Sequence, residues 1–157
     1  MKKILLITTG GTIASIQTKE GLIPGIDGSQ LVSFLPQIKQ MCEVDVISLF
    51  SEDSTNVYYK HWLMIAREIK KQYNDYDGFI ICHGTDTMSY TASALSYLIQ
   101  NSRKPIVLTG AQKPINLEIS DAKTNLLDSF TYACSDYAKG VVLIFNGNVI
   151  LGTRARK

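Results

Sequence analysis

Four short polar segments each follow an apolar run and are rich in glycine, hydroxyl or carboxylate groups. They are Thr8-Thr9-Gly10-Gly11-Thr12, Asp53-Ser54-Thr55, His83-Gly84-Thr85-Asp86-Thr87 and Thr109-Gly110-Ala111-Gln112. Glycine lets the backbone approach a small ligand closely and leaves amide N–H groups free to bind it. A hydroxyl beside such glycines is a potential nucleophile, provided that a base takes its proton. The segments are therefore candidates for a small-ligand site with a nucleophile.

The third segment places a carboxylate beside a hydroxyl, because Asp86 directly follows Thr85. A lysine held to that carboxylate accepts a proton if its pKa is lowered. A Ser-His-Asp site is not indicated, since the chain has only two histidines and His61 lies at the start of an expected helix. Cys82 and His83 are adjacent on an expected strand and point to opposite faces, so we expect His83 to be a hydrogen-bonded structural residue rather than a metal ligand.

Each segment taken alone also has a plainer explanation. The glycines after the first apolar run are typical of a tight turn, Thr85 or Asp86 is suited to capping a helix, and Asp53-Ser54 is suited to an ordinary turn. The Gly10-Gly11 pair lacks the G-x-G-x-x-G spacing of a dinucleotide site, and no Gly-Lys-Ser/Thr of a phosphate loop follows it. Polar segments after four consecutive apolar runs nevertheless favour one shared crevice, which simple turns would not require.

The elements that position these segments alternate between strand and helix. Short apolar runs predict strands at residues 4–7, 44–49, 79–82, 106–108 and 141–145. Helical spacing of apolar residues predicts helices at 62–73, 88–99 and 121–134, a short helix from an N-cap at Ser29 to Pro36, and a long loop at 12–28.

This alternation predicts an α/β fold, with a three-layer, Rossmann-like and mostly parallel sheet flanked by helices and joined by right-handed crossovers. In such a sheet, ligands bind outside the carboxyl ends of the strands, near the point where the strand order reverses. The four polar segments lie at those ends.

Composition limits the classes of function. The 157 residues fit one domain, and 16 basic against 14 acidic residues give no electrostatic reason to expect nucleic acid or a membrane as partner. Three widely spaced cysteines do not suggest a secreted disulfide framework. The amino-terminal apolar run is too short for a signal peptide, and no run approaches the ~20 residues that span a bilayer. We therefore expect a cytoplasmic protein.

Two longer motifs carry a family resemblance. Thr8-Thr9-Gly10-Gly11-Thr12-Ile13-Ala14 and His83-Gly84-Thr85-Asp86-Thr87-Met88 resemble the two signature motifs of bacterial-type L-asparaginases. The resemblance covers the entire chain and includes residues 53–55, 104–110 and 152–157. Residues 90–96 are most similar to those of the cytoplasmic type I enzymes.

The resemblance implies the chemistry of the site. Thr12 would be the nucleophile that attacks the side-chain amide of L-asparagine, giving a β-aspartyl ester and ammonia. Thr85, Asp86 and Lys157 would form a second set, in which Lys157 tunes Thr85 and Thr85 activates water or assists the attack. Asp86 would also hold the substrate's α-ammonium group.

The remaining implied contacts concern substrate binding. Ser54, with the backbone around Asp53 and Thr55, would receive the α-carboxylate. Backbone amides near Thr12 and Thr85, with the main chain of Ala111, would stabilise the oxyanion. The resemblance implies neither a metal nor an organic cofactor.

The sequence departs from the family pattern in two respects. Many members carry a tyrosine on the mobile loop where this chain has Leu22, which leaves the proton acceptor of Thr12 unassigned. Members are also roughly twice as long, with a smaller carboxyl-terminal domain that helps to build a homo-oligomer, a dimer or tetramer. We therefore expect residues 1–157 to form the amino-terminal catalytic domain and to be inactive, or nearly so, without that second domain.

Two alternative functions stay open. The asparaginase-like subunit of a tRNA-dependent amidotransferase shares these motifs, and a non-catalytic amino-acid-binding or assembly domain could share the fold. Glutamine is also a possible substrate, because one methylene changes binding by only ~1–3 kcal/mol.

Overall fold

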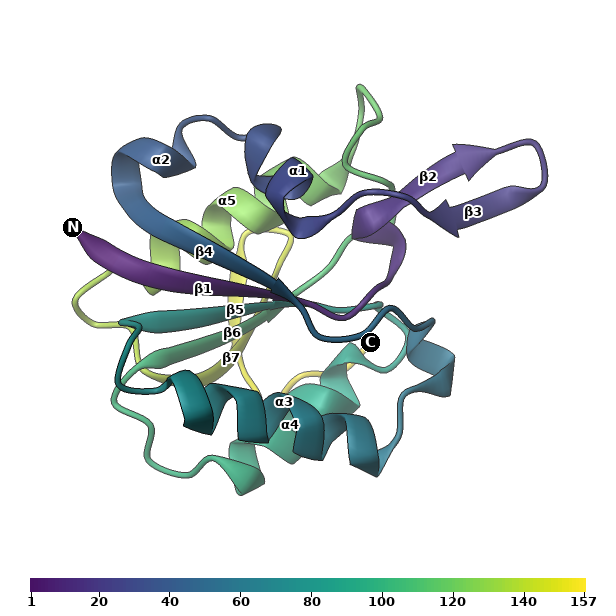
Figure 1. Ribbon diagram of the computed structural model, residues 1–157. Coiled ribbons are helices and arrows are strands. Elements are labelled where there is room, and N and C mark those ends of the chain that lie inside the picture. The colour runs from purple at the N-terminus through teal and green to yellow at the C-terminus, as the bar shows by residue number, and fades with distance from the viewer.

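Six strands form one sheet in the order β4-β1-β5-β6-β7-β8, and helices cover both faces in the computed structural model, which describes residues 1–157 (Figure 1). The strands are β1 (Lys2–Thr8), β4 (Cys42–Ser48), β5 (Gly78–Cys82), β6 (Pro105–Thr109), β7 (Gly140–Phe145) and β8 (Asn148–Leu151). All neighbouring pairs are parallel except β7 and β8. The predicted fold class and all five predicted strands are confirmed.

The central strands β5 and β6 are mostly apolar because helices cover both faces of the sheet. Every residue of β5 and β6 is buried. In β1, Ile4 and Leu6 pack into one core and Leu5 and Ile7 into the other, as the alternation of side chains along a strand requires.

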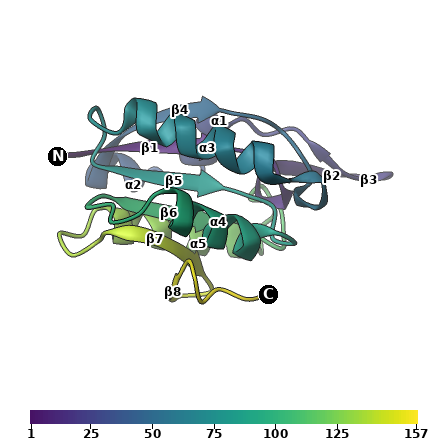
Figure 2. The ribbon, with the colours of Figure 1, turned by 90° about the horizontal axis from the view of Figure 1, so that it is seen from below.

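Three helices lie over the first core and two over the second, on opposite sides of the sheet (Figures 1 and 2). Over the first are α1 (Gly28–Ser33), α2 (Ile38–Met41) and α5 (Asp121–Ala133), and over the second are α3 (Tyr59–Gln72) and α4 (Met88–Leu98). No helix has the length and the apolar character needed to cross a membrane.

The crossovers are not all of one hand. From β5 to β6 to β7 the chain moves across the sheet in one direction, yet α4 covers one face and α5 the other. Two connections that move in the same direction on opposite faces have opposite hands. The connections through α1 and α2, through α3 and through α4 share one hand, and β6-α5-β7 has the other. The prediction of right-handed crossovers is therefore wrong for this connection. The segment between β6 and α5 passes to the first core, where Ile115 is buried and donates from its backbone to the carbonyl of Ile13.

The region predicted as one long loop at residues 12–28 is ordered. A 3-10 turn, η1 (Thr12–Ala14), leads into an antiparallel hairpin of β2 (Ser15–Thr18) and β3 (Gly21–Pro24). The Thr18 hydroxyl donates to the carbonyl of Gly21 at 2.8 Å and closes the turn. The prediction of a loop is wrong for β2 and β3, because the many glycines and polar residues of this segment gave no sign of the four paired residues in each strand.

One helix begins at a different residue than predicted, and two short elements were not predicted. The N-cap of α1 is Asp27 rather than Ser29, since Asp27 and Gln30 form a reciprocal capping box. The four-residue elements α2 and β8 were not predicted, because neither is long enough to show a period in the sequence.

The strand order reverses at β1. The chain passes from β1 to β4 on one side and later to β5 on the other, so the switch point lies between β1 and β5. Loops that leave neighbouring parallel strands in opposite directions open a crevice at their carboxyl ends. The segments that follow β1 and β5 contain Thr12 and Thr85.

Candidate active site

A cavity of about 240 Å³ lies at the carboxyl edge of the sheet, at the switch point. The loop after β1 contributes Thr12, the loop after β4 contributes Asp53 and Ser54, and the loop after β5 contributes Thr85 and Asp86. The prediction that four segments share one crevice is confirmed for these three, whereas no residue of the fourth segment, 109–112, lines this cavity.

Glycines allow the loops to approach one another this closely. A Cβ at Gly11 would lie 2.6 Å from the backbone nitrogen of Gly84, and one at Gly84 would lie 2.7 Å from the Ser54 side chain. The fourth loop is joined in the same way, because a Cβ at Gly110 would lie 2.3 Å from the carbonyl oxygen of His83. These contacts leave no room for any side chain at the three glycines.

Thr12 begins η1 and is half-buried in the wall of the cavity. No hydrogen bond within the chain engages its hydroxyl, which is therefore available to a ligand. Leu22 reaches the same cavity from β3 and is 44% exposed. The position at which the family resemblance implies a tyrosine thus lines the cavity, but the Leu22 side chain neither accepts nor donates a proton.

The loop after β4 is fixed by hydrogen bonds within itself and to the neighbouring loop. Asp53 caps η2 (Ser54–Asn56) and accepts from the backbone and the hydroxyl of Thr55, both at 2.8 Å, and these hydrogen bonds lower the pKa of Asp53. Ser54 is only 3% exposed. The Thr87 hydroxyl donates to the carbonyl of Ser54 at 2.7 Å. Thr55, bound to Asp53, does not line the cavity.

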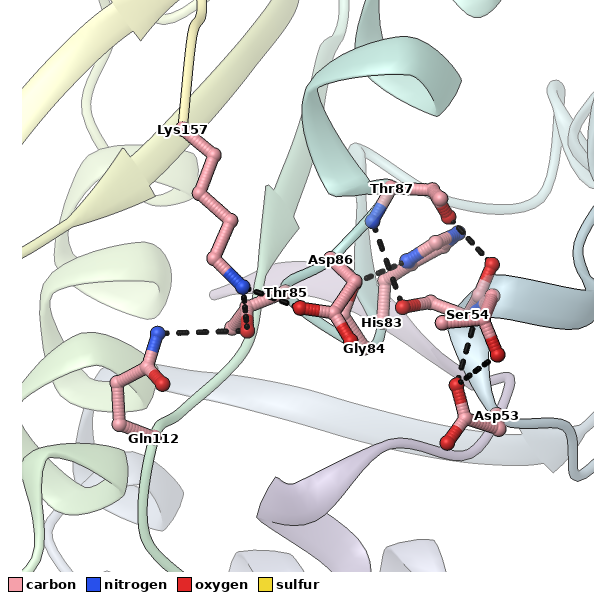
Figure 3. Close-up of polar contacts among 10 residues, drawn as sticks. Asp53, Ser54, His83, Gly84, Thr85, Asp86, Thr87, Gln112 and Lys157 are labelled. Carbon is pink, nitrogen blue, oxygen red and sulfur yellow. Dashed lines mark hydrogen bonds and ion pairs between the residues drawn. The ribbon is translucent and has the colours of Figure 1, made fainter.

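The Thr85 hydroxyl lies beside an ion pair formed by Lys157 and Asp86 (Figure 3). The Lys157 ammonium also donates to Thr85 Oγ1 at 3.4 Å, and Gln112 Nε2 donates to the same oxygen at 3.3 Å. The side chains of Lys157 and Asp86 are about half exposed, so the pair contributes little to stability. Its importance is chemical, because it holds a cation against a hydroxyl.

His83 is fully buried beneath this loop and makes two hydrogen bonds. Its Nδ1 lies 2.7 Å from the carbonyl oxygen of Gly84, which only accepts, so Nδ1 carries the proton. Nε2 is then the acceptor for the Thr91 hydroxyl at 2.9 Å, and Thr91 in turn accepts from Trp62 Nε1 at 3.0 Å. The prediction that His83 is a hydrogen-bonded structural residue is confirmed. This chain of hydrogen bonds ties α3 and α4 to the floor of the cavity.

Burial lowers the pKa of His83, which makes folding sensitive to acid. The folded state holds a neutral imidazole, whereas the unfolded chain takes up a proton near the ordinary value of 6.5. The contribution of neutral His83 to the free energy of unfolding is therefore fully present above pH 6.5. It is lost as the pH falls from there through the lower pKa of the folded state. We expect the urea midpoint to decrease between pH 7 and pH 5, and to decrease less in His83→Gln. The control variant His61→Gln should retain the full decrease in urea midpoint. An equal decrease in wild type and His83→Gln would mean that His83 is not the group responsible.

The structure brings together most of the predicted site residues. Thr12, Asp53, Ser54, Thr85 and Asp86 line one cavity, and Lys157 reaches Thr85 from outside it. Ala111 does not line that cavity and its side chain is buried in the first core, so the role predicted for its main chain stays a prediction. No group of three or more His, Cys, Asp or Glu side chains is arranged to hold a metal ion.

Two contacts were missed by the sequence analysis. Gln112 binds Thr85 and Thr87 binds the loop of Ser54, although the sequence indicated only that each belongs to one of the four polar segments. The polar side chains of these segments indicated that they could form hydrogen bonds. Which partner each one binds depends on how loops far apart in the chain lie against one another.

Sequence comparisons place this geometry in a known family. The family model described as "Asparaginase, N-terminal" matches residues 3–157. L-asparaginase of Thermococcus kodakarensis is 36% identical over 157 residues, and L-asparaginase 1 of Escherichia coli K12 is 38% identical over 161 residues. Each match covers 99% of this chain and 47% of the relative. A glutamyl-tRNA(Gln) amidotransferase subunit of Pyrococcus abyssi is 40% identical over 147 residues, which cover 92% of this chain and 34% of that protein.

Solved structures agree with the sequence matches. L-asparaginase I from Vibrio cholerae superposes with a TM-score of 0.90 at 36% identity, over 99% of this chain and 48% of that one. A probable cytoplasmic L-asparaginase from Campylobacter jejuni superposes with a TM-score of 0.85 at 31% identity, over 97% and 46%. The chain thus spans about half the length of these asparaginases. The shared motifs, the fold and the match along residues 3–157 show that the chain belongs to the asparaginase family, in the region of its amino-terminal domain.

Proposed function

We propose that this chain carries the active site of an L-asparaginase, which hydrolyses L-asparagine to L-aspartate and ammonia. The observation that carries the proposal is a single cavity lined both by Thr12, whose hydroxyl is unengaged, and by a second threonine, Thr85, which is bound to a lysine–aspartate pair. Thr12 Oγ attacks the side-chain amide carbon, and the C–N bond breaks to leave a β-aspartyl ester and ammonia. Water then cleaves the ester and restores the Thr12 hydroxyl.

The polar groups of the cavity suit the two ends of an amino acid. Asp86 would hold the α-ammonium group, since it is a carboxylate that lines the cavity. Ser54, with the backbone at Asp53 and Thr55, would receive the α-carboxylate, because Asp53 and Ser54 line the same cavity as Asp86. The side-chain amide of the ligand then extends toward Thr12.

The second threonine would act in the hydrolysis of the ester. Lys157 donates to Thr85 Oγ1 while it pairs with Asp86, so a cation tunes the hydroxyl that activates water. Backbone amides near Thr12 and Thr85, with the main chain of Ala111, would bind the oxyanion. Removal of one such donor typically costs on the order of 10²–10³ in rate.

The chain would act as one part of a larger cytoplasmic assembly. The relatives are about twice as long, which supports a second, smaller domain beside this one. Tyr90 and Tyr97 on α4 are 66% and 68% exposed, a surface that suits another protomer of a homo-oligomer. All three cysteines are free, as is usual in a reducing compartment.

A direct assay tests the proposed activity. We expect L-aspartate to shift the amide NMR signals of Thr12, Ser54 and Thr85, and ammonia release from L-asparagine to be much slower than that of E. coli L-asparaginase 1 assayed alongside. L-glutamine and D-asparagine, at equal concentrations, give the substrate preference. A chain that neither responds to L-aspartate nor releases ammonia would contradict the proposal, and turnover at the rate of the longer enzyme would contradict the need for a second domain.

A tRNA-dependent amidotransferase is the second candidate, because the amidotransferase protein of P. abyssi is as similar to this chain as the asparaginases are. That function requires recognition of tRNA. Binding of tRNA that weakens steeply with added salt would favour it, since phosphate contacts release counterions. The absence of salt-sensitive binding, with ammonia release from free L-asparagine, would exclude it.

A further inference from the structure

Thr85 lines two cavities. One is the cavity of Thr12 described above. The other, of about 150 Å³, contains Gln112 and Lys157 and has an apolar wall. That wall is formed by Met88, Leu143, Phe145 and Ile150. Thr85 belongs to both cavities, whereas Gln112 and Lys157 belong to the second and Thr12 to the first.

Two donors reach the same oxygen from the second cavity. Lys157 Nζ lies 3.4 Å and Gln112 Nε2 lies 3.3 Å from Thr85 Oγ1, and Figure 3 shows both side chains converging on it. An ammonium group and an amide NH₂ donate and do not accept. A hydroxyl oxygen has two lone pairs and one proton. When the two donors occupy both lone pairs, the proton of Thr85 points away from them.

We propose that Gln112 is a positioning residue, which with Lys157 directs the hydroxyl proton of Thr85 into the cavity of Thr12. The inference rests on the proposed function of Thr85 in the reaction. Without Gln112, one lone pair of Thr85 faces the second cavity unoccupied, and the hydroxyl is free to rotate about its C–O bond. With it, the hydroxyl is already oriented toward a ligand in the first cavity.

The backbone of Gln112 is held firmly enough for this role. The carboxylate of Asp121, at the start of α5, accepts from the backbone N–H of Gln112 at 2.8 Å and from that of Lys113 at 3.0 Å. Asn125, one turn further along α5, donates to the carbonyl of Gly110 at 2.9 Å. Helix α5 therefore clamps both ends of the segment that carries Gln112. Only the side chain of Gln112 remains to be fixed, and its contact with Thr85 does so.

Substitutions of Gln112 distinguish an effect on the orientation of the Thr85 hydroxyl from an effect on side-chain packing. Gln112→Met has the same length and no donor, and we expect kcat for ammonia release to fall about fivefold with KM nearly unchanged. The kcat of Gln112→Glu should be lower still at neutral pH, because the carboxylate accepts a hydrogen bond from the Thr85 hydroxyl and directs its proton toward the second cavity. As the pH falls and this carboxyl is protonated, it becomes a donor again, so the ratio of Gln112→Glu to wild-type kcat should rise. Gln37→Met, at an exposed glutamine without a side-chain hydrogen bond, is the control.

A measurement on the folded chain tests the inference without turnover. We expect the three-bond NMR coupling between the hydroxyl proton and Hβ of Thr85 to show one orientation about the C–O bond in the wild type and an averaged orientation in Gln112→Met. The hydroxyl proton should also exchange more slowly in the wild type than in that variant. Unchanged couplings and exchange in Gln112→Met, or the same pH profile for Gln112→Glu and wild type, would overturn the proposal. A wild-type chain that shows the ordered Thr85 but neither binds L-aspartate nor releases ammonia would contradict the proposed function instead.

Discussion

Thr12→Ala is expected to reduce ammonia release from L-asparagine by on the order of 10⁴-fold or more, while L-aspartate binding and thermal unfolding stay close to wild type. The loss follows because the proposed ester forms on the Thr12 hydroxyl, which the variant lacks. Stability is preserved because the Thr12 hydroxyl makes no hydrogen bond within the chain and the side chain is only half-buried. Long incubations at high protein concentration, with enzymatic detection of ammonia, make even a slow wild-type rate a usable reference.

Two further variants show whether the effect is chemical. Thr12→Ser keeps a hydroxyl and should keep a measurable rate. Thr9→Val removes a buried hydroxyl that donates to the carbonyl of Cys82 at 2.8 Å but does not line the cavity. It should lower stability by about 1–3 kcal/mol and leave the chemical step comparatively unaffected. If Thr12→Ala and Thr9→Val lowered turnover equally, Thr12 would not be the nucleophile.

The ester itself gives an independent readout. Acid quenching of the wild-type chain with L-asparagine should trap a β-aspartyl adduct on the peptide that contains Thr12, which mass spectrometry detects. The adduct should be absent from Thr12→Ala. An adduct on Thr85 in the wild type would reverse the roles of the two threonines.

Gly11→Ala is expected to destabilise the fold by about 3 kcal/mol or more and to remove ligand binding. Gly11 has φ of 87° and ψ of 172°, a backbone conformation that is essentially restricted to glycine. A Cβ there would also meet the backbone of Gly84 at 2.6 Å, and neither loop can yield without moving a strand end. Urea unfolding measures the loss of stability, and NMR titration with L-aspartate measures the loss of the site.

Gly140→Ala provides the matched control for the backbone. Its φ is also positive, at 70°, but nothing lies within 4 Å of the added Cβ. The cost should be only about 1–2 kcal/mol from the left-handed conformation, with L-aspartate binding retained. Equal losses in Gly11→Ala and Gly140→Ala would mean that the contact between the loops of Gly11 and Gly84 contributes nothing beyond backbone strain.

The order of elements was predictable from residues that are close in the sequence. The apolar run at Phe79–Cys82 is a buried strand because four consecutive large or sulfur-containing side chains need cover on both faces of a sheet. The same reasoning located the strands that begin near Ile4 and Ile106 and the helices α3, α4 and α5. It failed for the hairpin of β2 and β3, where hydrogen bonds between two short strands outweigh a composition typical of loops.

By itself, the sequence determined which residues end the strands of a parallel sheet, and hence that Thr12, Ser54 and Thr85 belong to one edge. The family resemblance implied that Lys157 joins Thr85 and Asp86, but no local pattern placed it there. Only the tertiary structure showed the Lys157–Asp86 ion pair, the donation from Gln112 to Thr85, and the position of α5 on the opposite face from α4. The physical reason is range. Side-chain periodicity and turn chemistry act over a few residues, whereas Lys157 and Asp86 are 71 positions apart and meet only after β5, β7 and β8 have paired in one register.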